Sequence, residues 1–265
     1  MLNRLSYRLV GALTRPYAGL IRGWRVDELG LGPEDPPPAA RTLYCYSPSL
    51  VSTPKDWGAD SVATGFWFRD RSGTGESVDP RLERFVSTGT PPVYVGFGSS
   101  VGADPARLGS TVMAAVRRVG VRAVVATGWG GMSGLSGGGD VFVVDTAPHA
   151  WLFPRVAAVV HHGGAGTTAA GLLAGRPTVI CPFQGDQFFW AAAVQRAGVG
   201  PAALPAKRLD TDRLGAAIRT AVDDPQISRR AAVMSTQMAG EDGIGRAAAE
   251  IEAVLTHGGR SVSSR

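Results

Sequence analysis

The sequence predicts an α/β fold, a doubly wound parallel sheet of the Rossmann-like kind. From Pro92 onward, short apolar runs with the length and branching of buried strands alternate with segments of helical periodicity. Strands are expected at 93–97, 123–127, 141–144, 156–160 and 178–181. Helices are expected at 105–119, 167–175, 186–197, 210–222 and 228–255. Because neighbouring parallel strands need a crossover connection, this alternation favours a parallel sheet.

The segments before and between these elements carry their own local signals. Residues 43–70 mix short apolar runs with turn residues, so short strands are expected there. Residues 71–79 are rich in glycine and serine and predict a mobile loop. Asp104 followed by Pro105 is typical of a helix N-cap and first helical position. The glycine-rich stretch 128–139 predicts a loop between two strands.

The first 41 residues differ in character from the rest of the chain. Residues 1–26 place leucines and Trp24 at helical spacing with arginines between them, and Pro16 interrupts the pattern. Such a basic amphipathic helix either lies on a membrane surface or packs on another domain, and we favour the packing interpretation. The proline-rich stretch 32–41 reads as a linker. The predicted organisation is therefore a helix with linker at 1–41, a main domain at 42–257 and a disordered tail at 258–265.

Composition excludes several classes of protein. The chain has 265 residues, of which 44% are hydrophobic and 18% charged, with no apolar run long enough to span a membrane. Its net charge of +5 is not gathered into a dense Lys/Arg block, which argues against nucleic-acid binding. Cys45 and Cys181 form no disulfide framework and fit a reducing cytoplasm. The sequence has no HExxH motif, paired CxxC or DxD-type motif, so no metal site is expected.

A glycine-rich turn at 161–166 joins the apolar strand at 156–160 to the helix expected from Thr167. Glycine lets the backbone approach a ligand closely, and the free N–H groups and dipole of a helix N-terminus favour a phosphate. Asp186 and Gln187 follow the next strand, at the edge of a parallel sheet where ligands bind. The same pair also fits a simple N-cap of the following helix.

A second turn, at 96–100, follows the first strand and offers the Ser99 hydroxyl and backbone N–H groups to a phosphate, or is an ordinary strand-to-helix turn. It does not match the dinucleotide fingerprint, because Val101 stands where the third glycine belongs.

These residues carry a resemblance to a known family. The stretch HHGGAGTTAAGLLAG, the pair Arg176-Pro177, and Pro182-Phe183 with Gly185-Asp186-Gln187 resemble the nucleotide-sugar signature of family 1 glycosyltransferases. The branch is similar to sterol glucosyltransferases and glycopeptide-antibiotic glycosyltransferases, and the resemblance covers roughly residues 43–255. It implies the C-terminal, donor-binding domain of the two-domain GT-B fold.

The resemblance also implies roles for individual residues. The donor diphosphate is expected at Ser99, His162, Gly164, Gly166, Thr167 and Thr168, the donor sugar at Asp186 and Gln187, and the nucleoside at Thr146, Ala147 and His149. Adjacent side chains in an extended segment face opposite sides, so His161 is expected to be structural. Trp190 is either a wall of the sugar pocket or core. Two plant-type nucleoside contacts are replaced here by Thr146 and Ala170, which leaves the choice between UDP and dTDP open.

By this resemblance the protein is a metal-independent, inverting hexosyltransferase. It would move a sugar from a UDP- or dTDP-sugar, a co-substrate and not a cofactor, to a hydroxyl of a lipid, sterol or natural-product acceptor. The family's general base is a histidine near the start of the first domain, but the first histidine here is His149. An acceptor-binding half is therefore expected outside this chain, as a separate protein or as the remainder of a truncated gene product, and residues 1–41 are expected to be its trailing helix and linker. The expected partners are such a half or a second copy of the chain, with at most peripheral membrane association. The alternatives are a non-catalytic nucleotide-sugar binding relic or regulator, and a dinucleotide-dependent enzyme.

Overall fold

The structure is a computed structural model that describes residues 12, 15–32, 34, 39–68, 78–98, 104–129 and 132–262, with side chains up to residue 256. The chain divides into two units, Met1–Thr42 and Leu43–Arg265. The first unit contains a 3-10 turn, Arg15–Tyr17, followed by helix α2 (Ala18–Asp27). Over residues 15–26 this agrees with the expected helix and its interruption at Pro16, while residues 1–11, 13 and 14 of that helix lie outside the described residues. Neither element has a buried residue, and Leu20, Ile21 and Trp24 are exposed.

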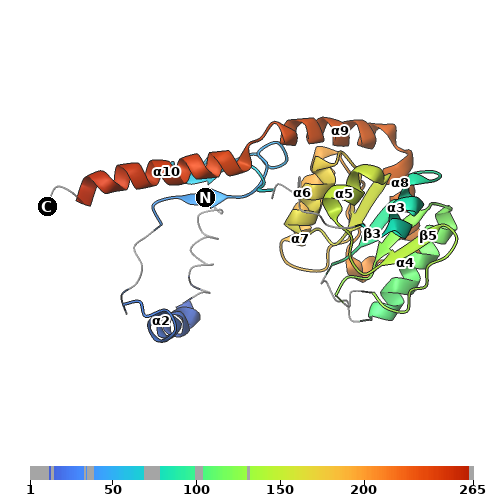
Figure 1. The fold of residues 1–265 in the computed structure, drawn as a ribbon, viewed down its shortest axis with the longest axis horizontal. Helices are drawn as coiled ribbons and strands as arrows, with labels where there is room; N and C mark the ends of the chain where they lie inside the picture. Colours follow the sequence, from blue (N-terminus) through green and yellow to red (C-terminus); the bar gives the residue numbers. More distant parts are fainter. Residues whose placement is uncertain are drawn as a thin grey trace. The chain divides into compact units, whose positions relative to one another are not determined.

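The second unit is built on a five-stranded parallel sheet (Figure 1). Its strands are β3 (Val93–Gly96), β4 (Ala123–Ala126), β5 (Val141–Val144), β6 (Ala158–His161) and β7 (Thr178–Ile180). Their spatial order is β5-β4-β3-β6-β7. The chain thus starts in the middle, moves to one edge, and returns to build the other side. This confirms the doubly wound prediction and puts the topological switch point between β3 and β6, where ligands bind in such sheets.

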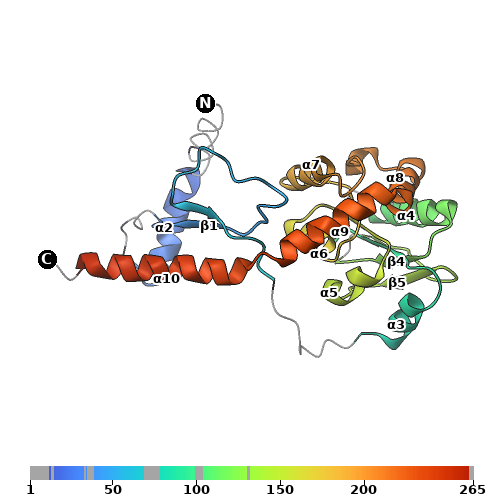
Figure 2. The same ribbon diagram turned by 90° about the horizontal axis from the view of Figure 1, so that it is seen from above.

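Helices cover both faces of the sheet, which explains why the strands read as continuous apolar runs. Val93 and Val95 pack with helices α4 (Pro105–Val119) and α8 (Thr211–Asp223). Tyr94 points the other way and packs with helices α3 (Pro80–Ser87) and α5 (His149–Leu152) and the 3-10 turn Phe153–Arg155. Figure 2 shows α4 and α3 on opposite sides of β4 and β5.

Two element boundaries at the glycine-rich turn differ from the predictions. Strand β6 includes His161 and begins at Ala158, because Val156 and Ala157 form a bend after the 3-10 turn Phe153–Arg155. Helix α6 (Ala165–Leu173) starts two residues before Thr167, because Gly164 already has extended backbone angles and serves as its N-cap. The turn between strand and helix is therefore only three residues long.

The C-terminal helical region was predicted wrongly as one helix at 228–255. It forms two helices, α9 (Pro225–Ala239) and α10 (Gly243–Val262). The Asp224 side chain accepts a hydrogen bond from the Gln226 N–H at 2.8 Å, which starts α9 earlier than expected. The Asp242 carboxylate accepts from the Gly245 N–H at 2.9 Å and starts α10 anew. Helix α10 continues to Val262, past the point at which a disordered tail was expected, and 263–265 lie outside the described residues.

Helices α3 and α5 were not predicted, although α3 had a readable signal. Asp79 and Pro80 repeat the Asp104-Pro105 pattern, and the Asp79 carboxylate accepts from the Arg81 N–H at 2.8 Å. The expected mobile loop at 71–79 lies outside the described residues except for its last two.

The remaining elements are β1 (Thr42–Tyr44) and β2 (Ser61–Ala63), which form a small sheet as expected for 43–70. Helix α7 (Gln187–Ala197) and a 3-10 turn (Ala206–Arg208) follow β7. Within the described ranges, none of the helices has the length and apolar character needed to cross a membrane.

Candidate functional site

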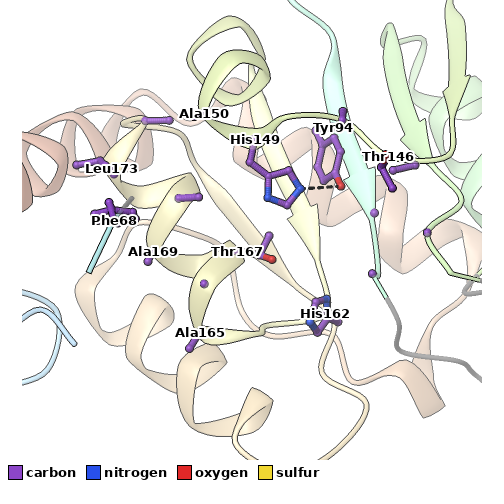
Figure 3. Close-up of a pocket in the computed structure, with 18 of the residues that line it drawn as sticks. Phe68, Tyr94, Thr146, His149, Ala150, His162, Ala165, Thr167, Ala169 and Leu173 are labelled. Atoms are coloured by element: carbon purple, nitrogen blue, oxygen red, sulfur yellow. Dashed lines mark hydrogen bonds between the residues drawn. The ribbon is translucent and has the colours of Figure 1, made fainter. Parts of the chain in front are cut away.

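A cavity of about 1150 Å³ opens at the carboxyl ends of the strands and extends along α6. It lies at the switch point, since β3 and β6 are paired with Gly96 opposite His161. Figure 3 shows Thr167 and His162 near the start of α6, and His149 with Tyr94 farther along the cavity. The lining residues with polar or aromatic side chains are Cys45, Phe66, Trp67, Phe68, Tyr94, Trp129, Asp145, Thr146, His149, His162 and Thr167.

Glycines in the turn after β6 bring the His162 ring and the backbone into close contact. Gly163 has a φ of +95°, and a Cβ there would lie 2.7 Å from the Ile180 methyl group. A Cβ on Gly164 would lie 2.5 Å from the His162 ring nitrogen Nε2. On the other side, a Cβ on Gly98 would lie 3.3 Å from the ring. The imidazole is thus held between the turns that follow β3 and β6.

The His162 ring is partly buried, and its hydrogen bonding and pKa differ from those of an exposed histidine. Its Nδ1 atom is buried and has no hydrogen-bond partner among the residues that the structure describes. Burial lowers the pKa of His162 below the usual value, while the nearby Asp186 carboxylate opposes this shift. A buried ring nitrogen without a hydrogen-bond partner carries a desolvation cost. The predicted phosphate-binding histidine lines the cavity with its ring.

His161 has the structural part expected of it. Its side chain is fully buried, its Nδ1 accepts the Gly163 N–H at 2.9 Å, and it does not line the cavity. The two histidine rings are nearly perpendicular, at 89°. The pKa of His161 lies well below the usual value because of burial first and the neighbouring His162 and His149 second.

The N-terminus of α6 forms the next part of the site. Gly164 is the N-cap and makes no side-chain cap, so the first N–H groups of the helix lack intrahelical partners. Gly166 and Thr167 line the cavity, and a Cβ on Gly166 would meet nothing within 4 Å. Thr168 is different: it is buried, and both its hydroxyl and its N–H donate to the Gly164 carbonyl at 2.9 Å. The Thr168 hydroxyl therefore stabilises the turn.

Asp186 and Gln187 lie outside the lining of this cavity. The Gln187 side chain is buried, and its Oε1 accepts from the N–H groups of Phe183 and Gln184 at 2.8 and 3.1 Å. Asp186 occupies the N-cap position of α7 without capping it, and its exposed carboxylate accepts from the Trp190 indole N–H at 3.0 Å. Trp190 packs against Phe66, with ring centroids 5.9 Å apart, and belongs to the core.

The expected nucleoside residues Thr146, Ala147 and His149 all line the cavity. The His149 ring stacks on Phe153 at 4.3 Å, and its Nε2 lies 3.3 Å from the Tyr94 hydroxyl. Burial raises the pKa of Tyr94 to about 12, so this phenol stays protonated. Sequence reasoning missed Tyr94, because its place in a buried strand made it look like ordinary core.

Sequence analysis also missed the aromatic wall of the cavity, which is formed by Phe66, Trp67 and Phe68, although the run GFWF is visible in the sequence.

The expected contact Ser99 lies outside the described residues, next to Gly98, which lines the cavity. Among the residues that the structure describes, no three His, Cys, Asp or Glu side chains gather as a metal site.

Comparison with known proteins places this chain in a family. Residues 110–255 match the family described as Erythromycin biosynthesis protein CIII-like, C-terminal domain. The chain belongs to this family. That range includes the α6 turn and the His149 end of the cavity, so the EryCIII-like match covers much of the site described above.

Curated relatives of this EryCIII-like chain include sterol glucosyltransferases. It is 39% identical over 220 residues to a sterol 3-beta-glucosyltransferase of Arabidopsis thaliana, covering 82% of this chain and 35% of the plant protein. It is 36% identical over 250 residues to a sterol 3-beta-glucosyltransferase of Emericella nidulans, covering 88% of this chain and 18% of the fungal protein. The chain thus spans about a third or less of the length of these relatives.

Solved structures confirm the fold of the EryCIII-like chain. A glycosyltransferase of kitacinnamycin superposes with a TM-score of 0.73 at 21% identity, over 95% of this chain and 66% of that one. The spinosyn forosaminyltransferase superposes with a TM-score of 0.64 at 18% identity, over 82% and 55% of the two chains. The predicted fold class, the C-terminal domain of a GT-B glycosyltransferase, is therefore confirmed.

Proposed function

We propose that this chain binds a nucleoside diphosphate sugar, UDP- or dTDP-linked, and supplies the donor site of a glycosyltransferase. The observation that carries the proposal is that the His162 ring and the uncapped N-terminus of α6 line one cavity at the switch point. Helix N–H groups and an imidazole are a suitable receptor for a diphosphate. The adjoining aromatic and apolar part of the cavity, near Thr146 and His149, suits a nucleoside.

The proposed reaction is transfer of a hexose to a hydroxyl of a lipid, sterol or natural-product acceptor. The acceptor oxygen forms a bond to the anomeric carbon as the bond to the diphosphate breaks, with inversion at that carbon. His162 and the first turn of α6 stabilise the negative charge that gathers on the departing diphosphate, so no metal is required. A general base in the acceptor-binding half takes the hydroxyl proton.

The proposal assigns that base to another polypeptide region or subunit, because His149 is the first histidine of this chain and is stacked on Phe153. An acceptor-binding partner, a separate half or a second copy, completes the enzyme in this scheme. Support for a glycosyltransferase comes from the relatives, among them the plant and fungal sterol 3-beta-glucosyltransferases. The two free cysteines fit a cytoplasmic setting.

Sugar recognition is proposed for Asp186 and Gln187, and single substitutions test it. Asp186→Ala removes an exposed carboxylate that would accept hydrogen bonds from sugar hydroxyls. It should therefore weaken the binding of UDP-glucose by roughly 1–3 kcal/mol and leave the affinity for UDP unchanged. Gln187→Glu keeps an oxygen for the N–H groups of Phe183 and Gln184 but loses the amide donor, so the same contrast is expected. Isothermal titration calorimetry with both ligands measures it.

The matched control is Trp190→Phe, which removes the indole N–H held by Asp186 but keeps the carboxylate. It should bind UDP-glucose with near wild-type affinity. If Asp186→Ala weakens UDP and UDP-glucose equally, or neither, the pair does not hold the sugar and its role is to shape the loop before α7.

A further inference from the structure

A segment far from the diphosphate end of the cavity builds its aromatic wall. Residues 43–68 contribute Cys45, Phe66, Trp67 and Phe68 to the lining. The two parts of this segment are tied together, since the Trp67 N–H donates to the Cys45 Sγ at 3.2 Å and the Gly65 N–H donates to the Tyr46 carbonyl at 3.1 Å. These two hydrogen bonds therefore link the aromatic wall, Phe66–Phe68, to residues 44–47.

This wall is fastened by one carboxylate oxygen at the junction between α9 and α10. Oε1 of Glu241 accepts from the Ser47 hydroxyl at 2.7 Å, the Ser49 hydroxyl at 2.7 Å and the Ser49 N–H at 3.3 Å. Ser47 is fully buried, so its hydroxyl depends on this acceptor. Three donors on one charged oxygen make a strong and specific attachment.

Close backbone packing supports the same attachment. A Cβ on Gly243 would lie 2.9 Å from the carbonyl carbon of Gly65, and Gly65 itself has a φ of +104°. A side chain at Gly243 would displace the backbone at Gly65, and one at Gly65 would be strained by the positive φ. The break between the two helices, which the sequence pattern did not reveal, thus serves to bring Glu241 and Gly243 against the wall segment.

The opposite wall of the cavity, α6, is joined to helix α9, which precedes this junction. The Ser235 hydroxyl of α9 donates to the Leu173 carbonyl at the end of α6, at 2.6 Å. Met234 and Met238 of α9 pack in one cluster with Phe66 and Leu172. Helix α9 with Glu241 at its end therefore sets the spacing between α6 and the aromatic wall.

We propose that Glu241 is a positioning residue for nucleotide-sugar binding, which holds the Phe66–Phe68 wall at its distance from α6 through Ser47 and Ser49. The inference rests on the proposed donor site. A wall that is held in place before the ligand arrives spares the ligand the entropy cost of ordering it. Glu241 acts through other residues and touches no reacting atom.

Calorimetric titration of UDP tests this role. Glu241→Ala should weaken UDP binding roughly tenfold, because two or three side chains must then be ordered on binding. Glu241→Gln keeps an oxygen acceptor and should stay close to wild type. The double change Ser47→Ala with Ser49→Ala should reproduce the loss, and adding it to Glu241→Ala should cost little more, since all act on one contact.

Asp242→Ala is the matched control for general destabilisation. It removes the neighbouring carboxylate, which holds the Gly245 N–H at the start of α10 and is bonded to nothing in the wall segment in the contacts described. It should lower the free energy of unfolding while leaving UDP affinity unchanged. If Glu241→Ala binds UDP as wild type does, or if both variants weaken binding in proportion to lost stability, the positioning role is refuted.

The rate of alkylation of Cys45 tests the attachment of the aromatic wall in the absence of nucleotide. Cys45 is exposed, whereas Cys181 is buried with a pKa raised to about 12 and stays unreactive in the folded chain. Maleimide should modify Cys45 several-fold faster in Glu241→Ala than in wild type or Asp242→Ala. An unchanged rate overturns the attachment itself. Should wild type bind no nucleotide, the binding role and the proposed donor site both fail, and the Cys45 rates still decide the attachment.

Discussion

Gly166→Asp should abolish most nucleotide binding while leaving the fold as stable as before or more so. Gly166 lies in the first turn of α6 and lines the cavity, and a Cβ added there meets no protein atom within 4 Å. An acidic residue at a helix N-terminus is favourable, and replacing glycine improves helix propensity, together by about 0.5–1.5 kcal/mol. A diphosphate beside the new carboxylate meets about 4 kcal/mol of repulsion at 4 Å, so UDP affinity should fall at least about a hundredfold.

Gly166→Asn is the matched control, because it has the same size without the charge. Its loss of UDP affinity should be much smaller than that of Gly166→Asp. Thermal unfolding and calorimetric titration on the three proteins give both quantities. If Gly166→Asp keeps its UDP affinity and its melting temperature, the diphosphate does not lie at the start of α6.

His162→Ala should weaken UDP binding by roughly 1.5–3 kcal/mol, because it removes one donor to a charged group. Phosphate favours the protonated imidazole, whose pKa burial lowers in the free protein. Wild-type affinity should therefore rise as pH falls from about 8 to 6, and this dependence should be lost in His162→Ala. Titrations at three pH values check both expectations. Equal affinity and equal pH dependence in the two proteins would remove His162 from the phosphate site.

The same shift sets the sign of a stability change in the free protein. The folded pKa values of His161 and His162 both lie below the ordinary 6.5. Below that pH the unfolded chain binds more protons than the folded one, so the free energy of unfolding should fall on acidification below about 6.5. Because His161 is fully buried, His162→Ala should remove only part of this fall.

The strand and helix sequence of the main unit was predictable because both faces of the sheet are covered. Apolar runs such as 123–127 and 141–144 lack the alternation of polar and apolar residues that marks a half-exposed strand, so they predict strands buried on both faces. The Asp104-Pro105 pair predicted the start of α4 at the right residue, and the same reasoning applied to Asp79-Pro80 would have found α3. The break between α9 and α10 was missed because Gly240 inside a helical pattern is compatible with one continuous helix.

The site was predictable where it depends on backbone, and less so where it depends on side-chain direction. The glycine turn before α6 follows from a strand-turn-helix pattern, and the resemblance implied His162 and Gly166 within it; both line the cavity. Thr168 and Gln187 were assigned to the ligand, and that assignment stays a prediction; the bonds of the Thr168 hydroxyl and the Gln187 Oε1 to nearby backbone groups are not revealed by residue spacing. The aromatic wall and its Glu241 attachment join positions more than 190 residues apart. Only the folded chain brings such positions together.

The most direct measurement for the donor-site account is calorimetric titration of the wild-type chain with UDP, dTDP, UDP-glucose and NADH in excess EDTA. The account predicts saturable binding of one nucleoside diphosphate or its sugar per chain, with no loss on chelation and no response to NADH. Binding that needs added Mg²⁺ or Mn²⁺, preference for NADH, or no binding of any uridine or thymidine diphosphate at millimolar concentration would contradict it.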